Sequence, residues 1–284
     1  ATVTSTAASP SPTSARTGPS STPQLQRLNA VVGTSTRALP VYWVAPGDRP
    51  GHKLYREYYS VPKVDAQTAV NAMLTGRPTD GDYGSPWRPA TAKVSVRATE
   101  IVVDLPAAAF ADPSVSRDLA RAGLQQLVYT ATAGAALQSG RPGSLPMRVL
   151  VDGKRGATVW KGVVLDEPLR RDASAVADVW VTSPVEGSVH RAGKLTVDVF
   201  GTAFEATALW EVYRVEAGAQ RRVHEGYLNI GSMGERAAGR FTVTLTPGEY
   251  RLRVYPSDPS DGEAPANPDV QADQTGDDKT IIVR

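Results

Sequence analysis

The hydrophobic pattern changes partway along the chain, and this change constrains the fold more than any other feature. Up to residue 172, helical and extended patterns alternate, whereas from residue 178 onward the apolar residues alternate as they do in strands. A chain of 284 residues is long enough for two ordinary domains. We therefore predict an α+β protein, with an α/β domain over residues 25–172 and an all-β domain over residues 173–284.

The first predicted domain alternates strands with two helices. Apolar residues recur at helical spacing after Asp65, a suitable N-cap, and again from residue 116 to about residue 134. Strands are predicted at residues 37–45, 54–61, 93–96, 101–105, 147–151 and 159–165, with the last two forming a hairpin around the turn Asp152-Gly153. This order predicts a sandwich of two helices against one mixed sheet.

The second predicted domain contains only strand patterns. Strands are predicted at residues 178–182, 195–200, 208–215, 222–228, 240–245, 250–255 and 280–283. Seven short strands separated by turns are typical of an immunoglobulin-like sandwich. Because the chain has no cysteine, the core of this sandwich must form by packing alone, for which the large candidates are Trp180, Phe200, Trp210, Phe241 and Leu252. We also expect Phe204 in the core.

Residues 1–24 differ from the rest in composition. They contain 16 Ser, Thr or Pro residues and almost no large apolar side chain, so they cannot bury enough surface to offset the entropy of ordering. We predict a disordered spacer. Such a spacer is typical of exported domains that are tethered away from a membrane or wall, although an ordinary flexible terminus would have the same composition.

Composition excludes several classes of site. With no cysteine and only three histidines, the chain offers no disulfide framework, no thiolate zinc site and no multi-histidine metal site. No run of 18 apolar residues is present, so no transmembrane span is predicted. A net charge of +2 predicts no nucleic-acid partner. The charge is nevertheless uneven, because residues 25–172 hold 19 Lys or Arg and 13 Asp or Glu, whereas residues 173–284 hold 11 and 16.

The motifs that suggest chemistry are weak. Ser60 and Lys63 fit the S-x-x-K pattern of serine nucleophiles, but the motifs that accompany it in such enzymes are missing. His190 and His224 would meet only if their strands pair, and we interpret them as surface histidines on strand edges. Seven acidic residues between 258 and 278 would suit Ca²⁺, but without an EF-hand spacing we interpret this segment as a solvated insertion. We therefore predict no catalytic residues, no cofactor and no metal.

The first domain resembles the GerMN domain of bacterial sporulation and germination proteins. The stretches that carry the resemblance are Val41–Trp43, Leu54–Val61, Ala72–Pro78, Ile101–Leu105, Leu127–Thr132, Met147–Gly153 and Glu167–Arg171, in that order over about residues 37–171. The resemblance implies a fold similar to ring-building modules of secretion and sporulation assemblies. It therefore implies self-association or docking to other envelope proteins.

The second domain resembles the immunoglobulin-like domain of bacterial spore germination. The matching stretches are Val181–Gly187, Val199–Ala206 and Gly239–Leu245, of which Gly201–Ala206 is the most specific. Together the two resemblances imply an exported, extracytoplasmic lipoprotein with no catalytic activity, anchored at the cell surface by a lipid attached upstream of residue 1. The bias toward Arg, with 24 Arg against 7 Lys, suits an actinobacterial source.

Three residues are candidates for binding a partner. Glu205 lies in the most specific stretch and would either present a carboxylate or bond to backbone amides at a strand bend. Trp43 and Tyr58 lie in an aromatic-rich region whose alternate side chains face opposite sides of a strand, so that some would be exposed and others would form the core. We predict a non-catalytic docking module for envelope proteins or for itself. The alternatives are cell-wall glycan or peptidoglycan binding and, less favoured, a hydrolase.

Overall fold

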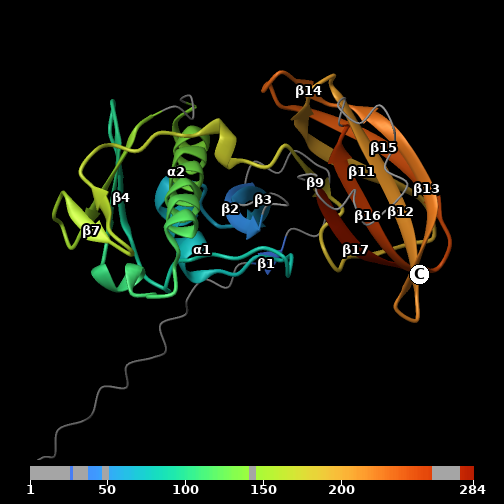
Figure 1. Ribbon diagram of the computed structural model, residues 1–284, viewed down its shortest axis with the longest axis horizontal. Coiled ribbons are helices and arrows are strands. Elements are labelled where there is room, and N and C mark those ends of the chain that lie inside the picture. The colour runs from blue at the N-terminus through green and yellow to red at the C-terminus, as the bar shows by residue number, and fades with distance from the viewer. Residues whose placement is uncertain (1–25, 28–37, 47–50, 141–144, 258–275) are drawn as a thin grey trace, which may run out of the picture.

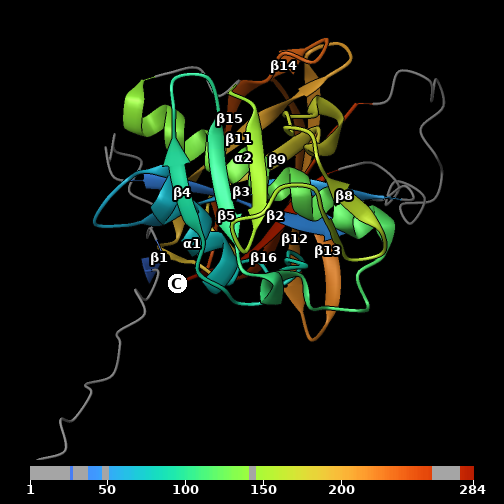
Figure 2. The ribbon, with the colours of Figure 1, turned by 90° about the vertical axis from the view of Figure 1, so that its left-hand side faces the viewer.

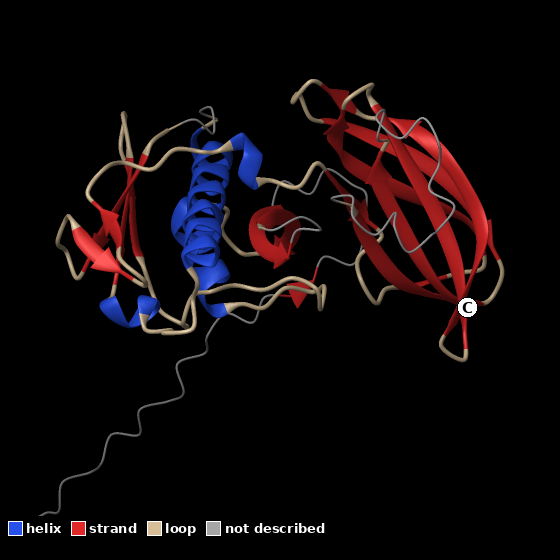
Figure 3. Cartoon of the chain, viewed as in Figure 1, coloured by secondary structure: helices blue, strands red, loops and turns tan. Residues whose placement is uncertain are grey.

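The computed structural model describes residues 26–27, 38–46, 51–140, 145–257 and 276–284. Helices and strands share the first part of the chain, and only strands form the second, as Figures 1 and 3 show. The predicted α+β class is therefore confirmed. The predicted spacer at 1–24 and most of the acidic segment lie outside the described residues. No described helix has the length and hydropathy that a membrane span requires.

The two helices of the first domain form where the spacing predicts them. Helix α1 (Ala66–Thr75) begins after Asp65, whose carboxylate accepts a hydrogen bond from the Thr68 amide at 2.7 Å. Helix α2 (Arg117–Ser139) begins after Ser116 and ends at Gly140, which adopts the left-handed conformation of a C-cap. The helices pack closely, because Gly134 of α2 lies directly against the first turn of α1.

The strands of this domain form separate sheets rather than the single one predicted. Strand β4 (Lys93–Val96) is antiparallel and strand β6 (Met147–Val151) is parallel to β5 (Ile101–Leu105), which makes a mixed sheet. Strand β3 (His52–Ser60) pairs instead with β2 (Ala38–Pro46) and with β1 (Gln26–Arg27). Figures 1 and 2 show α2 between these two sheets. The outer edge of β2 is covered by α2, since Thr130 accepts from the amide of Tyr42 and Gln126 donates to its carbonyl.

The predicted hairpin of residues 147–151 with 159–165 is wrong. Strand β7 (Ala157–Val159) pairs with β8 (Val163–Leu165), while β6 pairs with β5. The turn at Asp152-Gly153 is present, with φ of 49° and 77° at the two residues, but it leads out of β6 into this small hairpin. A short 3-10 helix, η1 (Ala107–Phe110), completes the domain, and a second, η2 (Ala173–Ala175), lies in the connection to the second domain.

The second domain is an antiparallel β-sandwich with short parallel additions. One sheet has the order β10 (Val189–His190), β17 (Asp277–Val283), β16 (Gly248–Pro256), β12 (Thr207–Glu216) and β13 (Ala219–Asn229). In the other, β11 (Gly193–Ala203) pairs with β15 (Ala237–Leu245) along one side and with β9 (Val179–Ser183) and β14 (Gly231–Ser232) along the other. The immunoglobulin-like class is confirmed, and the two-residue strands β10 and β14 are additions that the pattern did not predict.

The core of the sandwich differs from the predicted core at two positions, Trp180 and Phe200. Leu252 is fully buried inside the sandwich, as expected. Trp180 is also buried, but it belongs to the apolar cluster of the first domain, and Phe200 packs against that cluster as well. Two aromatic residues of the sandwich therefore form part of the junction between the domains.

Candidate functional site

A buried polar cluster joins the two domains. The ammonium group of Lys279, on β17, lies 2.6 Å from a carboxylate oxygen of Asp80 and 2.8 Å from one of Asp277. It also donates to the hydroxyl of Tyr83 at 2.7 Å, and that hydroxyl donates to Asp277 at 2.6 Å. Asp80 and Tyr83 follow α1 in the first domain, so each domain supplies both an acid and a second polar group. We call these four residues the junction cluster.

The electrostatics of the junction cluster explain why the charges can stay buried. The side chains of Lys279 and Asp80 are each 5% exposed, and burial alone disfavours an ammonium ion. Burial by itself lowers the pKa of Lys279, but the carboxylates of Asp277 and Asp80 outweigh this effect and raise that pKa overall. Burial likewise raises the pKa of Asp277, against the opposing effect of Lys279. The cluster is thus a satisfied ion pair that fixes one domain against the other, with no polar position left open for a substrate.

The predicted binding residues lie in very different places. Trp43 is fully buried, and its indole nitrogen donates to the Tyr59 hydroxyl at 2.9 Å, so its ring is not available to a partner. Tyr58 is 37% exposed, but the guanidinium of Arg56 lies over its ring, 4.9 Å from the centroid. Glu205 is exposed, and its carboxylate has no hydrogen-bond partner among the described residues. The structure does not bring these three residues together.

Glu205 stands beside two exposed apolar residues at one end of the sandwich. Phe204 is 61% exposed and Met233 is 83% exposed, so the expectation that Phe204 belongs to the core is wrong. Glu235 is exposed in the same turn as Met233. We call Phe204, Glu205, Met233 and Glu235 the tip, which lies next to β14 in Figure 1.

Hydrogen bonds hold the two loops of the tip together. Ser232 donates through its hydroxyl to the carbonyl of Phe204 at 3.1 Å, and the Gly234 amide donates to the Thr202 hydroxyl at 3.2 Å. Ala206 and Met233 adopt left-handed φ values of 57° and 53°, which non-glycine residues rarely do. The exposed side chains are therefore carried by loops that are fixed to each other and strained locally.

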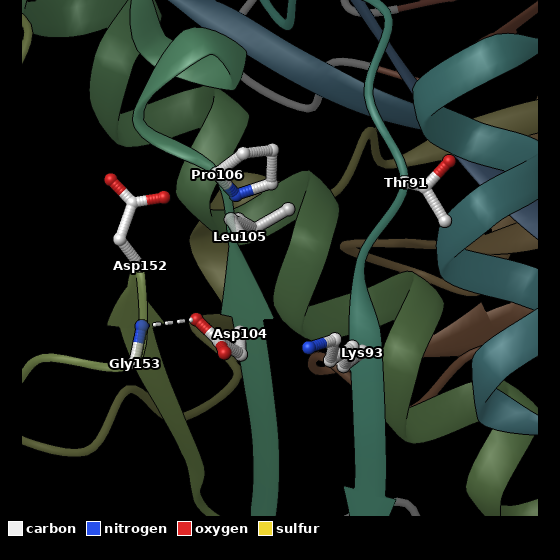
Figure 4. A pocket seen from close by; sticks show the side chains of 7 residues that line it. All are labelled: Thr91, Lys93, Asp104, Leu105, Pro106, Asp152 and Gly153. Atoms are coloured by element: carbon white, nitrogen blue, oxygen red, sulfur yellow. Dashed lines mark hydrogen bonds between the residues drawn. The ribbon is translucent and has the colours of Figure 1, made fainter.

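The first domain has a shallow pocket at one end of its mixed sheet (Figure 4). Its volume is about 380 Å³, and it is lined by Thr91, Lys93, Asp104, Leu105, Pro106, Asp152 and Gly153. Asp104 accepts from the Gly153 amide at 2.8 Å, and Asp152 accepts from the Ala107 amide at 3.3 Å. Lys93 points toward Asp104 in Figure 4. Both carboxylates thus support the surrounding turns, and none of the lining residues is a histidine or a paired nucleophile.

Among the described residues, the structure contains neither the histidine pair nor a cluster of metal ligands. Strand β10 carries His190 and strand β13 carries His224, and these strands form opposite edges of the five-stranded sheet. His190 instead lies 2.8 Å from the Ser188 hydroxyl. Within the described ranges, no group of three His, Cys, Asp or Glu residues could hold a metal ion. The acidic segment can be judged only at Asp277 and Asp278, and there Asp277 bonds to Lys279 while Asp278 pairs with Arg251.

Sequence reasoning missed the junction cluster, although one signal for it exists. Along β17, the side chains of Asp277, Lys279, Ile281 and Val283 alternate inward. A lysine at an inward position of an alternating strand indicates a buried charge that needs a carboxylate partner. The partner Asp80 is 199 residues away in the sequence, and no local pattern identifies it.

Each of the two domains matches a known protein family. Residues 40–156 match a family described as sporulation and spore germination, and residues 178–263 match the immunoglobulin-like domain of bacterial spore germination. No curated protein matches the sequence.

Among solved structures, two similar chains correspond to parts of this one. A CARDB domain from Pyrococcus furiosus, solved in complex with di-metal ions, is 16% identical, with 37% of this chain and 89% of that chain covered and a TM-score of 0.23. A chain from a study of T-cell activation by the superantigen toxic shock syndrome toxin-1 is 12% identical, with 38% and 99% covered and a TM-score of 0.24. The two family matches follow each other in the predicted order, so this chain carries a domain of the sporulation and spore germination family followed by the immunoglobulin-like domain of bacterial spore germination.

Proposed function

We propose that this protein is a non-catalytic docking module of the cell envelope, which binds a second copy of itself through the tip. The observation that supports this proposal is the exposure of Phe204 and Met233, at 61% and 83%, on two loops that are hydrogen-bonded to each other. Exposed apolar side chains on a fixed support are typical of interaction surfaces. The resemblance of the first domain to ring-building modules also supports self-association.

Charge favours a second copy as the occupant of this surface. The tip adds two carboxylates, those of Glu205 and Glu235, to the apolar pair, so it fits an apolar surface with a basic rim. Residues 25–172 carry the excess of Lys and Arg, whereas residues 173–284 carry the excess of Asp and Glu. We infer a head-to-tail contact, in which the tip of one copy meets the first domain of the next, and such contacts generate rings or filaments.

The absence of catalysis and the location outside the cytoplasm belong to the same proposal. Both matched families are described by sporulation and germination, and neither description names a reaction. In the proposal, the protein is an extracytoplasmic lipoprotein, held at the cell surface by a lipid anchor and a spacer over residues 1–24. Its partners are envelope proteins, first of all itself.

Sedimentation velocity over a range of protein concentrations tests the proposal. We expect a concentration-dependent oligomer in the wild type, and at least about a tenfold weaker association when Phe204→Ser and Met233→Ser are combined. Val189→Ser is the matched control, because Val189 is 53% exposed on the same domain but lies on β10 rather than in the tip. A wild type that stays monomeric up to about 100 μM would overturn self-association, since useful weak contacts have dissociation constants below this range.

Peptidoglycan binding remains the second candidate, and one observation supports it. Tyr58 is part exposed, with a guanidinium over one face of its ring, and an exposed tyrosine ring can stack its other face on a sugar. Co-sedimentation with insoluble peptidoglycan at physiological salt tests it. Saturable pelleting that Tyr58→Ala weakens would favour this candidate, whereas wild-type protein left in the supernatant would reject it.

A further inference from the structure

Three arginines at the domain junction make no ion pair with an acid among the described residues. Arg56 comes from β3, Arg171 from the segment after β8, and Arg236 from the turn between β14 and β15. No ion pair connects any of the three to a carboxylate among the described residues. Half-buried cations without a counter-charge are unusual, because removing a cation from water is unfavourable unless an anion compensates for it.

Arg56 is enclosed by aromatic rings rather than by acceptors. Its guanidinium lies 4.8 Å from the ring centre of Phe200, 5.3 Å from that of Trp180 and 4.9 Å from that of Tyr58. Two of these rings belong to the second domain and one to the first. The Nε atom is buried without a hydrogen-bond partner, and no described residue bonds to the two Nη groups. The rings hold the guanidinium in place, and its donors have no acceptor in the part of the chain that the structure describes.

Arg171 is connected to Arg56 through two tyrosines. Tyr42 is the cross-strand neighbour of Arg56 on β2, and its ring centre lies 5.1 Å from that of Tyr129 on α2. The guanidinium of Arg171 lies over Tyr129, 4.6 Å from the ring centre, and its Nε donates to the Thr132 hydroxyl at 2.7 Å. Burial lowers the pKa of Arg171, and the charge of Arg56 lowers it further against the opposing effect of both tyrosines.

Arg236 reaches the surroundings of Tyr129 from the second domain, because burial raises the pKa of Tyr129 and the charges of Arg171 and Arg236 both oppose this effect. One of its Nη groups donates to the carbonyls of Ala173, Val176 and Ala177 in the connection between the domains, at 3.3–3.4 Å. Its Nε is buried without a partner, as that of Arg56 is. Asp172, on the same connection, makes no ion pair with a described arginine, and one of its carboxylate oxygens accepts from the amide and the hydroxyl of Ser174.

We propose that Arg56, Arg171 and Arg236 form a binding site for a phosphate group at the junction of the two domains. Three guanidinium groups carry three positive charges, and a phosphate carries more negative charge and more acceptor oxygens than a carboxylate does. Guanidinium N–H groups match phosphate oxygens in pairs, so the unused donors of Arg56 become satisfied when the ligand binds. The site is built from both domains, so an occupied site also favours the present arrangement of the domains.

Isothermal titration calorimetry of the full chain with inorganic phosphate, at constant ionic strength, tests the site. We expect saturable binding of phosphate, competition by sulfate, and no heat from chloride or acetate at the same ionic strength. Arg56→Gln should weaken binding at least tenfold. Arg121→Gln is the matched control, because Arg121 is an exposed arginine of α2 that makes no ion pair within the described residues, and it should bind as the wild type does.

A second variant and a vesicle experiment complete the test. Should Arg56→Gln not fold by circular dichroism, Arg171→Gln takes its place, since the side chain of Arg171 bonds to Thr132 and Tyr129 of the first domain. Pelleting with phosphatidylglycerol vesicles, reduced by the same variant, would identify the phosphate as that of a lipid headgroup, whereas binding of free phosphate without pelleting identifies a water-exposed phosphate. The proposal fails if phosphate binds no better than acetate, or if Arg121→Gln weakens binding as much as Arg56→Gln does.

Discussion

Lys279 and the tip show what single side chains contribute to this protein. Lys279 is buried with two carboxylates, so its charge contributes to the structure, and removing it leaves Asp80 and Asp277 facing each other in a poorly hydrated place. Phe204 and Met233 are exposed, so they contribute little to folding and are free to contact a partner. Burial therefore separates residues that hold the molecule together from residues that act on its surroundings.

Replacing Lys279 should destabilise the protein strongly. Lys279→Met keeps much of the side-chain volume but leaves two buried carboxylates without their cation, for which we expect a loss of about 3–5 kcal/mol in the free energy of unfolding. Urea denaturation measures this loss. Lys194→Met is the control, because Lys194 is exposed on β11, and it should change the free energy by less than about 0.5 kcal/mol. Equal effects of the two substitutions would contradict the account of the junction cluster.

The same lysine predicts a loss of stability in alkali. Because the carboxylates raise the pKa of Lys279 overall, the folded state binds this proton more tightly than the unfolded state does. The resulting stabilisation is fully present below a pH of about 10.4, the ordinary lysine pKa, and is lost as the pH rises through the folded-state value. The free energy of unfolding, measured from pH 8 to 11, should fall more steeply in the wild type than in Lys279→Met. Parallel slopes in the two proteins would be the contrary result.

At the residue scale, sequence reasoning identified some positions and missed others for physical reasons. The specific stretch around Glu205 does lie at an exposed end, but Trp43 is buried, because alternation along a strand does not say which of its faces is covered. The tendency of large aromatic residues to be buried predicts Phe204 inside, but it lies exposed in the turn that contains Ala206, whose φ is left-handed. No local pattern identifies Arg56, because two of the rings around it, those of Trp180 and Phe200, come from the other domain.

At the scale of elements, the contact between α1 and α2 depends on a missing side chain. A Cβ atom at Gly134 would lie 2.8 Å from the carbonyl oxygen of Asp65 and 2.9 Å from the Cα of Ala66. These are backbone atoms of the N-cap and first turn of α1, so they cannot move aside as a flexible side chain would. The close approach of the two helices therefore requires glycine here.

Gly134→Ala should destabilise the protein although it improves helix propensity. Alanine is favoured over glycine in a helix by about 1 kcal/mol, but the clash with α1 costs about 1–3 kcal/mol, and we expect a net loss. Thermal unfolding monitored by circular dichroism measures it. Gly81→Ala is the control, since a Cβ there meets nothing within 4 Å. A melting temperature of Gly134→Ala above that of the wild type would show that the helices separate without cost.

Elements were easier to predict than their pairing. Both helices follow from apolar spacing and from caps at Asp65 and Ser116, because these signals are local. The pairing of β7 with β8 was missed, since alternation in residues 147–151 and 159–165 fits several partners equally well. The parallel pairing of β5 with β6 depends on the crossover through α2, and this is a property of the whole domain.

At the scale of the whole molecule, the two domains form a single unit. The junction cluster, Arg56 between aromatic rings of both domains, and Arg236 on the connecting segment all cross the boundary. The sequence predicts two domains and the order of their families, but it does not predict this union, because every contact joins residues far apart in the chain. The opposite net charges of the two parts of the chain are the one sequence feature that favours a contact between them.

The coupling of the two domains should be measurable by differential scanning calorimetry. We expect one cooperative transition for the wild type, because the domains share an apolar cluster and a buried ion pair. Lys279→Met should separate it into two transitions, as the domains lose their coupling. Two well-resolved transitions in the wild type would mean that the junction adds little to stability.

Site-specific photo-crosslinking from the tip tests the docking proposal most directly. Phe204 is replaced by p-benzoyl-phenylalanine in one copy, which is mixed with an isotopically labelled wild-type copy before irradiation and peptide mapping by mass spectrometry. We predict crosslinks from position 204 to labelled peptides of the first domain, within residues 38–140. Crosslinks confined to the same chain, or none at a concentration where the wild type is oligomeric, would contradict docking through the tip.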